Sequence, residues 1–312
     1  MLDLLYAVVV GPVKDMLGAP TFLAEVVIGG LAAGLMYSLV ALGFVLIYKA
    51  SGVFNFAQGV MVLFAALTLV GLMERGVPLV PALALTMLVM VALAFTIERV
   101  VLRPLVNQEQ IILFMATIGL NFFLEGFGEM VWGSNVKKLD VGIPDTSFML
   151  WGIQMNRLEL TAAMTAAVLV AVMAVFFQRT RIGRALRAVA DDHEAALSIG
   201  IPLNTIWIVV WSVAGLVAIV AGIMWGAKSG VQFSLSLIAL KALPVLILGG
   251  FTSVPGAIVG GLIIGVGEKL AEVYWGPLVG GAIENWFAYV LALAFLLVRP
   301  QGLFGEKIIE RV

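Results

Sequence analysis

The chain has 312 residues, of which 62% are hydrophobic and only 12% are charged, and its mean hydropathy is +1.12. These values exclude an ordinary soluble domain and predict a polytopic helical membrane protein. Long unbroken apolar runs exclude a membrane β-barrel, because barrel strands alternate apolar and polar residues. The formal net charge of −1 gives no sign of a nucleic-acid partner, and the absence of cysteine excludes disulfides and thiol chemistry.

The N-terminal extension, residues 1–21, contains the apolar stretch MLDLLYAVVVGPVKDM. It lacks the positively charged start of a signal peptide, and its apolar run is broken by Gly-Pro at residues 11–12. We therefore expect a short helix in this extension that lies at the membrane interface or at the periphery of the protein.

Residues 22–305 contain the apolar segments that are candidates for crossing a bilayer, which takes about 20 residues. The candidate spans are 25–48, 57–73, 79–98, 110–131, 159–178, 205–227, 238–250, 256–271 and 285–299. The sequence thus predicts an all-α bundle of about eight or nine transmembrane segments. The Gly-rich stretch near 238–271 is interrupted by Thr252, Ser253 and Pro255, and both of its pieces are short for full crossings. Two half-helices and one re-entrant hairpin both remain open for it.

Basic residues in short loops predict which side of the membrane each loop occupies. Four arginines follow the fifth span, so the loop 179–204 is expected in the cytoplasm, as is Lys49. Basic residues at the end of the chain put the C-terminus and the tail 306–312 on the same side, provided that the Gly-rich pair crosses the membrane twice. This scheme leaves the N-terminus outside and makes 132–158 the longest external loop.

The cytoplasmic loop contains a stretch that reads as a short capped helix, DDHEAALSIGIP at 191–202. Asp191 and Glu194 have the spacing of a capping box, while Gly200 and Pro202 end the helix. A helix of about two turns is not stable alone in water, so it must pack on a partner protein or lie on the bilayer surface. The small side chains that it presents are Ala195, Ala196 and Leu197.

Three stretches, in this order along the chain, resemble one family of permeases. They are GGLAAGLMYSLVALGFVLIYKASGVFNFAQG (29–59), RIGRALRAVADDHEAALSIGI (181–201) and LGGFTSVPGAIVGGLIIGVGE (248–268). They are similar to the first span with its Asn-Phe-Ala signature, the cytoplasmic coupling loop and the Gly-rich segment of branched-chain amino acid type ABC-importer permeases, the LivH/LivM family. The resemblance extends over about residues 22–305, while the N-terminal extension departs from the short N-terminus of the LivH type.

The resemblance implies that the short helix of the loop docks on a cytoplasmic ATPase. The residues implied in docking are Arg184, Asp191, Glu194, Ala195, Ala196 and Gly200. It also implies a homologous second permease subunit, two ATPase subunits and a periplasmic substrate-binding protein, assembled in the bacterial inner membrane. The chain has no G-x-x-x-x-G-K-[ST] motif, so we expect no enzyme activity or cofactor here, with ATP and Mg²⁺ bound by the partner ATPases.

Strongly polar side chains at membrane depth mark either a pathway or an internal contact. The candidates for a substrate path are Ser38, Asn55, Gln58, Thr117 and Asn121. Thr117, Asn121 and Glu125 follow one another at intervals of four residues and share a helix face. Hydrogen bonding between helices is the competing interpretation, and we favour it for Ser38 and Thr117. For Asn55 and Asn121 both interpretations stay open, and Glu125 is expected near the outer interface.

Glycines spaced four apart permit close approach of helices. Plain packing is the favoured interpretation, with motion of the broken segment, or a place beside the pore, as the alternative. The glycines in question are Gly249, Gly250, Gly256, Gly260 and Gly261, together with Gly30 and Gly34. Lys241 and the neighbouring pair Glu268 and Lys269 are expected at the membrane interface rather than along a pore.

The main hypothesis is the permease subunit of an ATP-driven importer of hydrophobic or branched-chain amino acids, working by alternating access. Urea, short amides or small carboxylic acids are alternative substrates on the same scaffold. A stand-alone secondary carrier or channel is the alternative from another class, although the chain has a single histidine and no evident repeat of paired broken helices. An intramembrane enzyme would need a catalytic dyad, and none is evident in the sequence.

Overall fold

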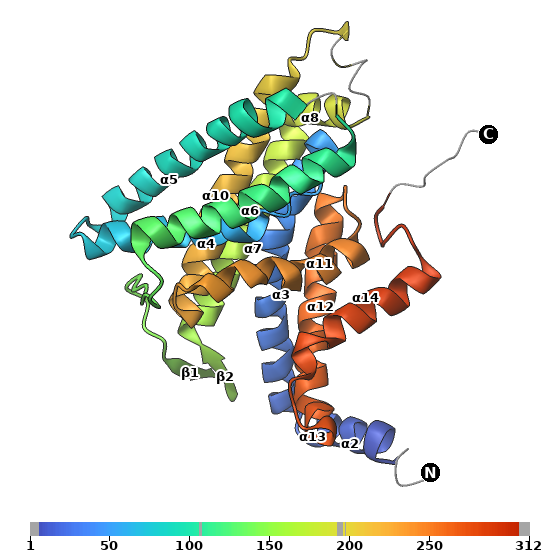
Figure 1. Cartoon of the computed structure of the whole chain (residues 1–312). Helices are drawn as coiled ribbons and strands as arrows, with labels where there is room; N and C mark the ends of the chain where they lie inside the picture. The colour runs from blue at the N-terminus through green and yellow to red at the C-terminus, as the bar shows by residue number, and fades with distance from the viewer. Residues whose placement is uncertain (1–5, 106–107, 192–195, 197, 306–312) are drawn as a thin grey trace.

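Helices dominate the part of the chain that the computed structural model describes, residues 6–105, 108–191, 196 and 198–305 (Figure 1). The α-helices are α2 (Gly11–Gly18), α3 (Pro20–Ser51), α4 (Gln58–Glu74), α5 (Leu79–Thr96), α6 (Gln110–Trp132), α7 (Arg157–Arg179), α8 (Arg181–Asp191), α10 (Leu203–Ser229), α11 (Ile238–Gly249), α12 (Val254–Tyr274), α13 (Gly276–Val279) and α14 (Phe287–Val298). Short π or 3₁₀ segments are η1 (Tyr6–Val10), η2 (Ile97–Leu102), η3 (Arg103–Leu105), η4 (Phe233–Leu237) and η5 (Ile283–Asn285). The strands are β1 (Ser147–Leu150) and β2 (Ile153–Asn156).

Six of the described helices are long and apolar enough to cross a membrane: α3, α5 with its continuation to Leu105, α6, α7, α10 and α12. Three shorter apolar helical segments, at Gln58–Glu74, Phe233–Gly249 and Phe287–Val298, lie at the other three predicted spans. Each candidate span therefore corresponds to an apolar helix, and the prediction of a helical polytopic membrane protein is confirmed.

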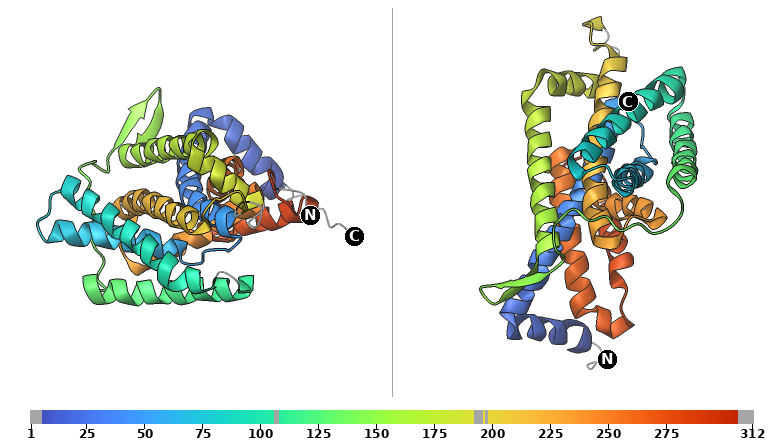
Figure 2. Two further views of the ribbon diagram at one scale, coloured as in Figure 1. Left: turned by 90° about the horizontal axis from the view of Figure 1, so that it is seen from above. Right: turned by 90° about the vertical axis from the view of Figure 1, so that its left-hand side faces the viewer.

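The centre of the bundle is formed by α3 and α4. Burial is continuous from Met36 to Ile47 in α3 and from Gln58 to Gly71 in α4. A helix that is apolar on all sides belongs inside a larger bundle, which explains why these two helices show no polar face. In Figures 1 and 2, α3 runs along the length of the molecule, and it packs mainly against α12, α10 and α7.

The outer helices expose large apolar side chains instead of polar ones. Leu88 of α5, Phe123 of α6, Val168 of α7 and Leu297 of α14 are 65%, 64%, 63% and 82% exposed. Apolar surface of this kind is unfavourable in water and matches the hydrocarbon core of a bilayer. These helices therefore form an apolar outer shell around α3 and α4, as expected of a membrane protein.

The Gly-rich stretch is one short helix followed by one long helix. α12 has 21 residues, about 31 Å at 1.5 Å per residue, which is enough to cross the bilayer. α11 has 12 residues and contains Pro244, so it is short for a crossing. The expectation of two short pieces is wrong for the second, because the α12 helix continues beyond residue 271 to Tyr274.

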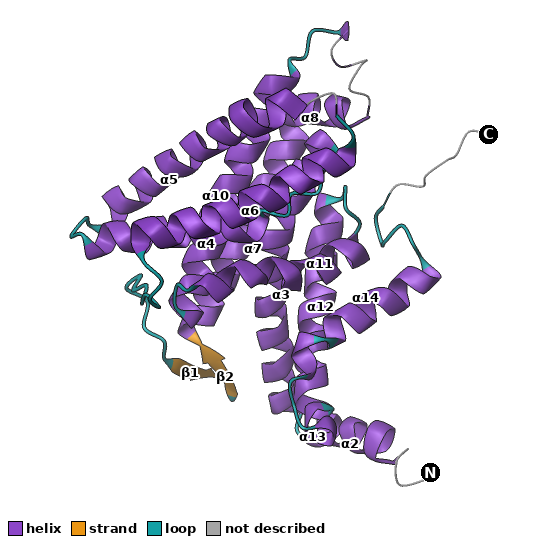
Figure 3. Cartoon of the chain, in the orientation of Figure 1, coloured by secondary structure: helices purple, strands orange, loops and turns teal. Residues whose placement is uncertain are grey.

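The loop between α6 and α7 contains an antiparallel hairpin, which the sequence analysis did not predict (Figure 3). Trp151 and Gly152 form its turn, with φ of 52° and 80°. Positive φ at both central residues matches the twist of paired strands. Asn156 then begins α7, since its side chain accepts a hydrogen bond from the Glu159 N–H at 3.1 Å.

Polar and terminal elements gather at the two ends of the bundle. The hairpin, α2 and α13 lie at one end, and α8 lies at the other (Figures 1 and 2). The Trp275 indole N–H donates to the Val8 carbonyl at 2.9 Å, which ties the start of the chain to the end of α12. The described part of the N-terminal extension is thus a short helical segment lying across one end of the bundle.

Candidate functional site

The turn at residues 52–57 connects the two central helices, α3 and α4, and is stabilised by hydrogen bonds of the buried Asn55 side chain. Gly52, with φ of 68°, ends α3. Asn55 is fully buried, and its Oδ1 accepts the Ala57 N–H at 3.1 Å. The Asn55 Nδ2 donates to Gln58 Oε1 at 3.4 Å. The polar atoms of Asn55 are thus used within the turn.

Thr117 of α6 fixes the other side of this turn. Its hydroxyl oxygen accepts the Phe56 N–H at 3.1 Å and donates to the Phe114 carbonyl at 2.8 Å. Phe54 and Phe56 consequently contact Phe114, with ring centroids 6.3 and 6.2 Å away. A single buried hydroxyl therefore orients two aromatic rings that follow α3.

These rings border a cavity of about 240 Å³, here called the aromatic cavity, between α3, α6 and the η4–α11 segment. Its aromatic and polar lining is Phe44, Phe54, Phe56, Asn121, Phe122, Glu125 and Ser236. Leu240 and Leu243 of α11 add an apolar wall. The cavity therefore combines a mostly apolar surface with an amide, a carboxyl and a hydroxyl group, as ligand pockets generally do.

Of the predicted path residues, Asn121 lines the aromatic cavity and Thr117 supports its wall. Ser38 is buried, and its hydroxyl donates to the Gly34 carbonyl at 2.8 Å, which agrees with the packing interpretation. Gln58 is fully buried against the backbone of Gly43. The structure thus brings Asn121 and Glu125 together with phenylalanines that the sequence analysis did not single out, although the F-N-F spacing of residues 54–56 was a visible signal.

The glycines predicted at helix contacts lie where two backbones meet. A Cβ atom at Gly34 would lie 2.5 Å from the Gly261 carbonyl oxygen, and one at Gly260 would lie 2.6 Å from the Val245 carbonyl oxygen. Gly249 and Gly256 face each other in the same way across the α11–α12 pair. Close packing is what the spacing predicted, and it locks α12 against both α3 and α11.

The last described residues of the chain cap α11. The Leu303 and Phe304 N–H groups donate to the carbonyls of Leu248 and Gly249 at 2.8 and 3.2 Å. Gly250 adopts φ of 102°, and a Cβ atom there would lie 2.8 Å from the backbone nitrogen of Gly305. Only glycine fits this position, so Gly250 serves a turn and a close approach together.

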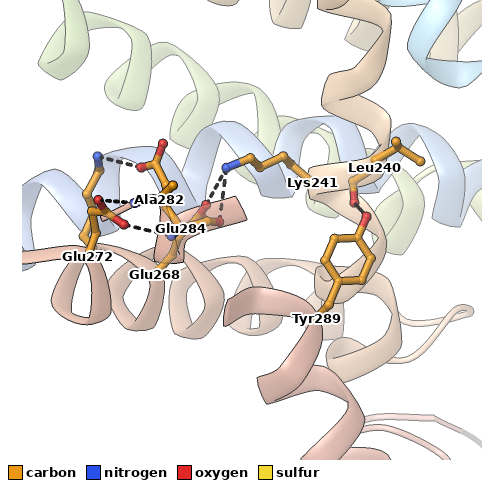
Figure 4. A network of polar contacts seen from close by, with 8 residues as sticks. Leu240, Lys241, Glu268, Glu272, Ala282, Glu284 and Tyr289 are labelled. Atoms are coloured by element: carbon orange, nitrogen blue, oxygen red, sulfur yellow. Dashed lines mark hydrogen bonds and ion pairs between the residues drawn. The ribbon is translucent and has the colours of Figure 1, made fainter. Parts of the chain in front are cut away.

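Pro244 leaves one carbonyl of α11 without its helical donor, the carbonyl of Leu240. The Tyr289 hydroxyl of α14 donates to that carbonyl at 2.7 Å (Figure 4). The proline therefore makes α11 depend on α14 for a hydrogen bond that an ordinary helix makes internally. The bonded carbonyl belongs to a residue that lines the aromatic cavity.

Lys241 and Glu268 form a largely buried ion pair, which the sequence analysis had placed at the interface. Lys241 Nζ lies 2.7 Å from Glu268 Oε1, and their side chains are 27% and 3% exposed. The pair joins α11 to α12, and Lys241 also donates to the Glu284 carbonyl at 3.3 Å (Figure 4). Packing against α3 and α11 covers this face of α12, so Glu268 is buried inside the protein, while its expected depth at the membrane interface stays a prediction.

The predicted docking loop begins with a helix, α8, for which the sequence analysis predicted no secondary structure, only an arginine-rich segment before the loop helix. α8 continues through Asp191, so this residue closes one helix, where the sequence analysis took it to cap the start of another. Arg184 is exposed on α8. Glu194 and Ala195 lie outside the described residues.

The predicted end of the loop helix is confirmed. Gly200 has φ of 85°, and the Ile201 N–H donates to the Ala196 carbonyl at 3.0 Å, the bond pattern of a glycine-terminated helix. Ala196 is only 1% exposed and belongs to the core of this chain. The expectation that Ala196 presents its side chain to a partner is therefore wrong, whereas Ile199 is 74% exposed.

Comparison with known proteins identifies the family. Residues 26–299 match the family described as "Branched-chain amino acid transport system / permease component". The permease protein BraD of Pseudomonas aeruginosa, of a high-affinity branched-chain amino acid transport system, is 30% identical over 91% of this chain and 96% of its own length. The corresponding LivH of Escherichia coli is 29% identical over 91% of this chain and 96% of its own length.

More distant proteins cover a similar share of the chain. A probable LivH of Methanocaldococcus jannaschii is 28% identical over 86% of this chain and 88% of its own length. Among solved structures, PsaBC of Streptococcus pneumoniae in complex with Fab matches with a TM-score of 0.44 and 12% identity, over 86% of this chain and 89% of that one. The family match extends over most of the described fold, and the chain belongs to the permease-component family of branched-chain amino acid transport systems.

Proposed function

We propose that this chain is the membrane-spanning permease subunit of an ATP-driven importer, and that it forms part of the path for branched-chain and other hydrophobic amino acids. The names of its relatives support the substrate class. The observation that carries the proposal is the aromatic cavity, which four phenylalanines line together with Asn121, Glu125 and Ser236.

The chemistry of this cavity suits a small zwitterion with an apolar side chain. The phenylalanine and leucine walls favour an aliphatic group, while the amide, hydroxyl and carboxyl groups can bind the ammonium and carboxylate ends. Its volume of about 240 Å³ is below the roughly 300–1,000 Å³ of pockets for drug-sized ligands, as a small solute requires. Urea or a short amide would leave most of the apolar wall uncovered.

The chain would obtain its energy from partners. It has no phosphate-binding loop motif, so ATP and Mg²⁺ would be bound by two cytoplasmic ATPase subunits. A homologous permease would complete the path, and a periplasmic binding protein would deliver the substrate and set most of the selectivity. We assign the complex to the bacterial inner membrane, with the loop 179–204 and the C-terminus in the cytoplasm.

In this proposal the loop 179–204 carries the ATPase contact, through Arg184 and the residues around Glu194, Ala195 and Gly200. The exposed Ile199 adds an apolar group to the same surface. Closure of the two ATPases would displace the loop as a rigid body and thereby move the spans that it connects, α7 and α10.

The test is to purify the complex from its native membrane in mild detergent and to measure ATP-dependent uptake in proteoliposomes. We expect two P-loop ATPases and a sister permease to copurify, and leucine but not urea to be taken up. Glu194→Lys combined with Ala195→Trp should release the ATPases while the spans stay folded. Recovery of the chain alone, with transport that ignores ATP, would instead identify a stand-alone carrier or channel.

A further inference from the structure

A second cavity lies against the opposite face of α11. It has a volume of about 240 Å³ and is here called the lysine cavity. The residues that matter for its chemistry are Trp225, Ser229, Gln232, Ser234, Leu237 and Lys241. Ile238 and Lys241 lie on one face of α11, while Ala239, Leu240 and Leu243 face the aromatic cavity. Leu237 lines both cavities, so this residue and α11 separate them.

Lys241 brings a positive charge with unused hydrogen-bonding capacity to this cavity. A lysine ammonium has three N–H donors. Two acceptors lie within reach, Glu268 Oε1 at 2.7 Å and the Glu284 carbonyl at 3.3 Å (Figure 4). The third donor has no acceptor among the described residues, and the Lys241 side chain is 27% exposed although its partner Glu268 is buried. The ammonium can therefore hold Glu268 and still bind a ligand oxygen.

The other lining residues fit the same kind of ligand. The Trp225 indole N–H is a second buried donor that has no acceptor in the described part of the chain. Its ring stacks on Tyr37, with centroids 5.7 Å apart, and the Lys228 ammonium lies 5.9 Å from its centroid. Ser229, Gln232 and Ser234 supply further polar groups. A partly exposed ammonium beside hydroxyl and amide groups matches a carboxylate.

The charge of the site favours a zwitterion over a simple anion. Lys241 is already neutralised by Glu268, so a ligand with a net negative charge would add an uncompensated charge to a largely buried site. An amino acid is neutral overall, and its carboxylate can accept from Lys241 while its ammonium is stabilised by the serine hydroxyls and the Gln232 amide.

We propose that the lysine cavity is a second substrate station, in which Lys241 binds the carboxylate of the transported amino acid before the molecule passes α11 toward the aromatic cavity. This inference rests on the proposed function, because it assumes that an amino acid is the substrate. It assigns Lys241 a role in recognising the carboxylate and Glu268 a role in positioning the Lys241 ammonium.

The test compares leucine with leucinamide, which keeps the side chain and the amino group but lacks the carboxylate. Equilibrium binding of both compounds is measured on the assembled complex in nanodiscs, without the binding protein. We expect the wild-type complex to bind leucine at least about tenfold more tightly than leucinamide, the effect of one charge-assisted hydrogen bond.

The decisive variant is Lys241→Gln combined with Glu268→Gln, which removes both charges and leaves no buried carboxylate without its partner. In this variant we expect the preference for leucine over leucinamide to disappear. Lys137→Gln is the matched control, since Lys137 pairs with Glu74 outside both cavities. It should keep the wild-type preference.

A double variant that retains the wild-type preference would overturn the assignment, as would a wild-type complex that binds the two compounds equally. Size-exclusion chromatography with all subunits present verifies that the double variant assembles. ATP-dependent leucine uptake by the wild-type complex tests the proposed function separately from the role of the lysine cavity. If uptake occurs but the preference does not depend on Lys241, the proposed function stands and the lysine cavity is not a station.

Discussion

The two asparagines that the sequence analysis singled out have different structural surroundings. The Asn55 amide is bonded inside the buried turn at 52–57, whereas Asn121 borders the aromatic cavity. Asn55→Leu removes the acceptor of the Ala57 N–H, and a buried donor left unsatisfied costs about 1–3 kcal/mol. We expect this variant to lower the thermal unfolding temperature of the complex.

Asn121→Leu serves as the comparison, because it makes the same change at the cavity wall. We expect it to leave the unfolding temperature and subunit assembly unchanged while it reduces leucine uptake at least about tenfold, as the loss of one hydrogen bond to a charged ligand would. If Asn55→Leu were instead stable but inactive in transport, Asn55 would have to be assigned to the substrate path.

Some of the polar residues could be placed from the sequence, and others could not. The polar line Thr117–Asn121–Glu125 was visible because helix periodicity puts these residues on one face. The buried pair Lys241–Glu268 was not, because its members are 27 positions apart and only the packing of α11 on α12 brings them together. From sequence alone, a charged residue in the outer part of a span is assigned to the membrane interface, because the helix that supplies its partner is not known.

At the scale of elements, the contact between α3 and α12 depends on glycines. Gly34→Ala would put a methyl group 2.5 Å from the Gly261 carbonyl oxygen, so the two backbones would have to separate. Overpacking of this kind typically costs 1–3 kcal/mol. We expect a lower unfolding temperature and weaker assembly for this variant.

Gly29→Ala is the matched control on the same helix. A methyl group at Gly29 would meet nothing within 4 Å, and alanine is favoured over glycine in a helix interior by about 0.5–1 kcal/mol. We expect this variant to be as stable as wild type or slightly more so. Equal destabilisation by both substitutions would show that the loss of glycine itself matters and that the contact does not.

The positions of the spans followed from hydropathy, because each is an apolar helix, long in six cases and shorter in three. The hairpin and α8 could not be found in that way. The hairpin turn is Trp-Gly, which lacks the usual Asn-Gly or Asp-Gly signal. α8 depends on tertiary packing, because its Leu186 and Val189 side chains belong to the hydrophobic core. Its arginines lower the average hydropathy of the segment, so the apolar face does not show in that average.

At the scale of the whole molecule, the orientation in the membrane is open to a direct test, because the chain contains no cysteine. A single introduced cysteine is then the only thiol of this chain that a maleimide can label. Met149 in the hairpin and Ile199 in the loop 179–204 are suitable positions, since they are 72% and 74% exposed. Phe304, 49% exposed, reports on the C-terminal segment.

We expect Met149→Cys to react with a membrane-impermeant maleimide in intact spheroplasts. Ile199→Cys and Phe304→Cys should react only after permeabilisation, because the arginines around α8 and the basic C-terminus mark the cytoplasmic side. Ile199→Cys should also be shielded when the ATPase subunits are bound, while Phe304→Cys gives the reference for permeability. Labelling of Met149→Cys and Ile199→Cys from the same side would contradict the predicted number of crossings. Labelling of Ile199→Cys alone from outside would invert the whole scheme, and the loop 179–204 could then not be the contact for a cytoplasmic ATPase.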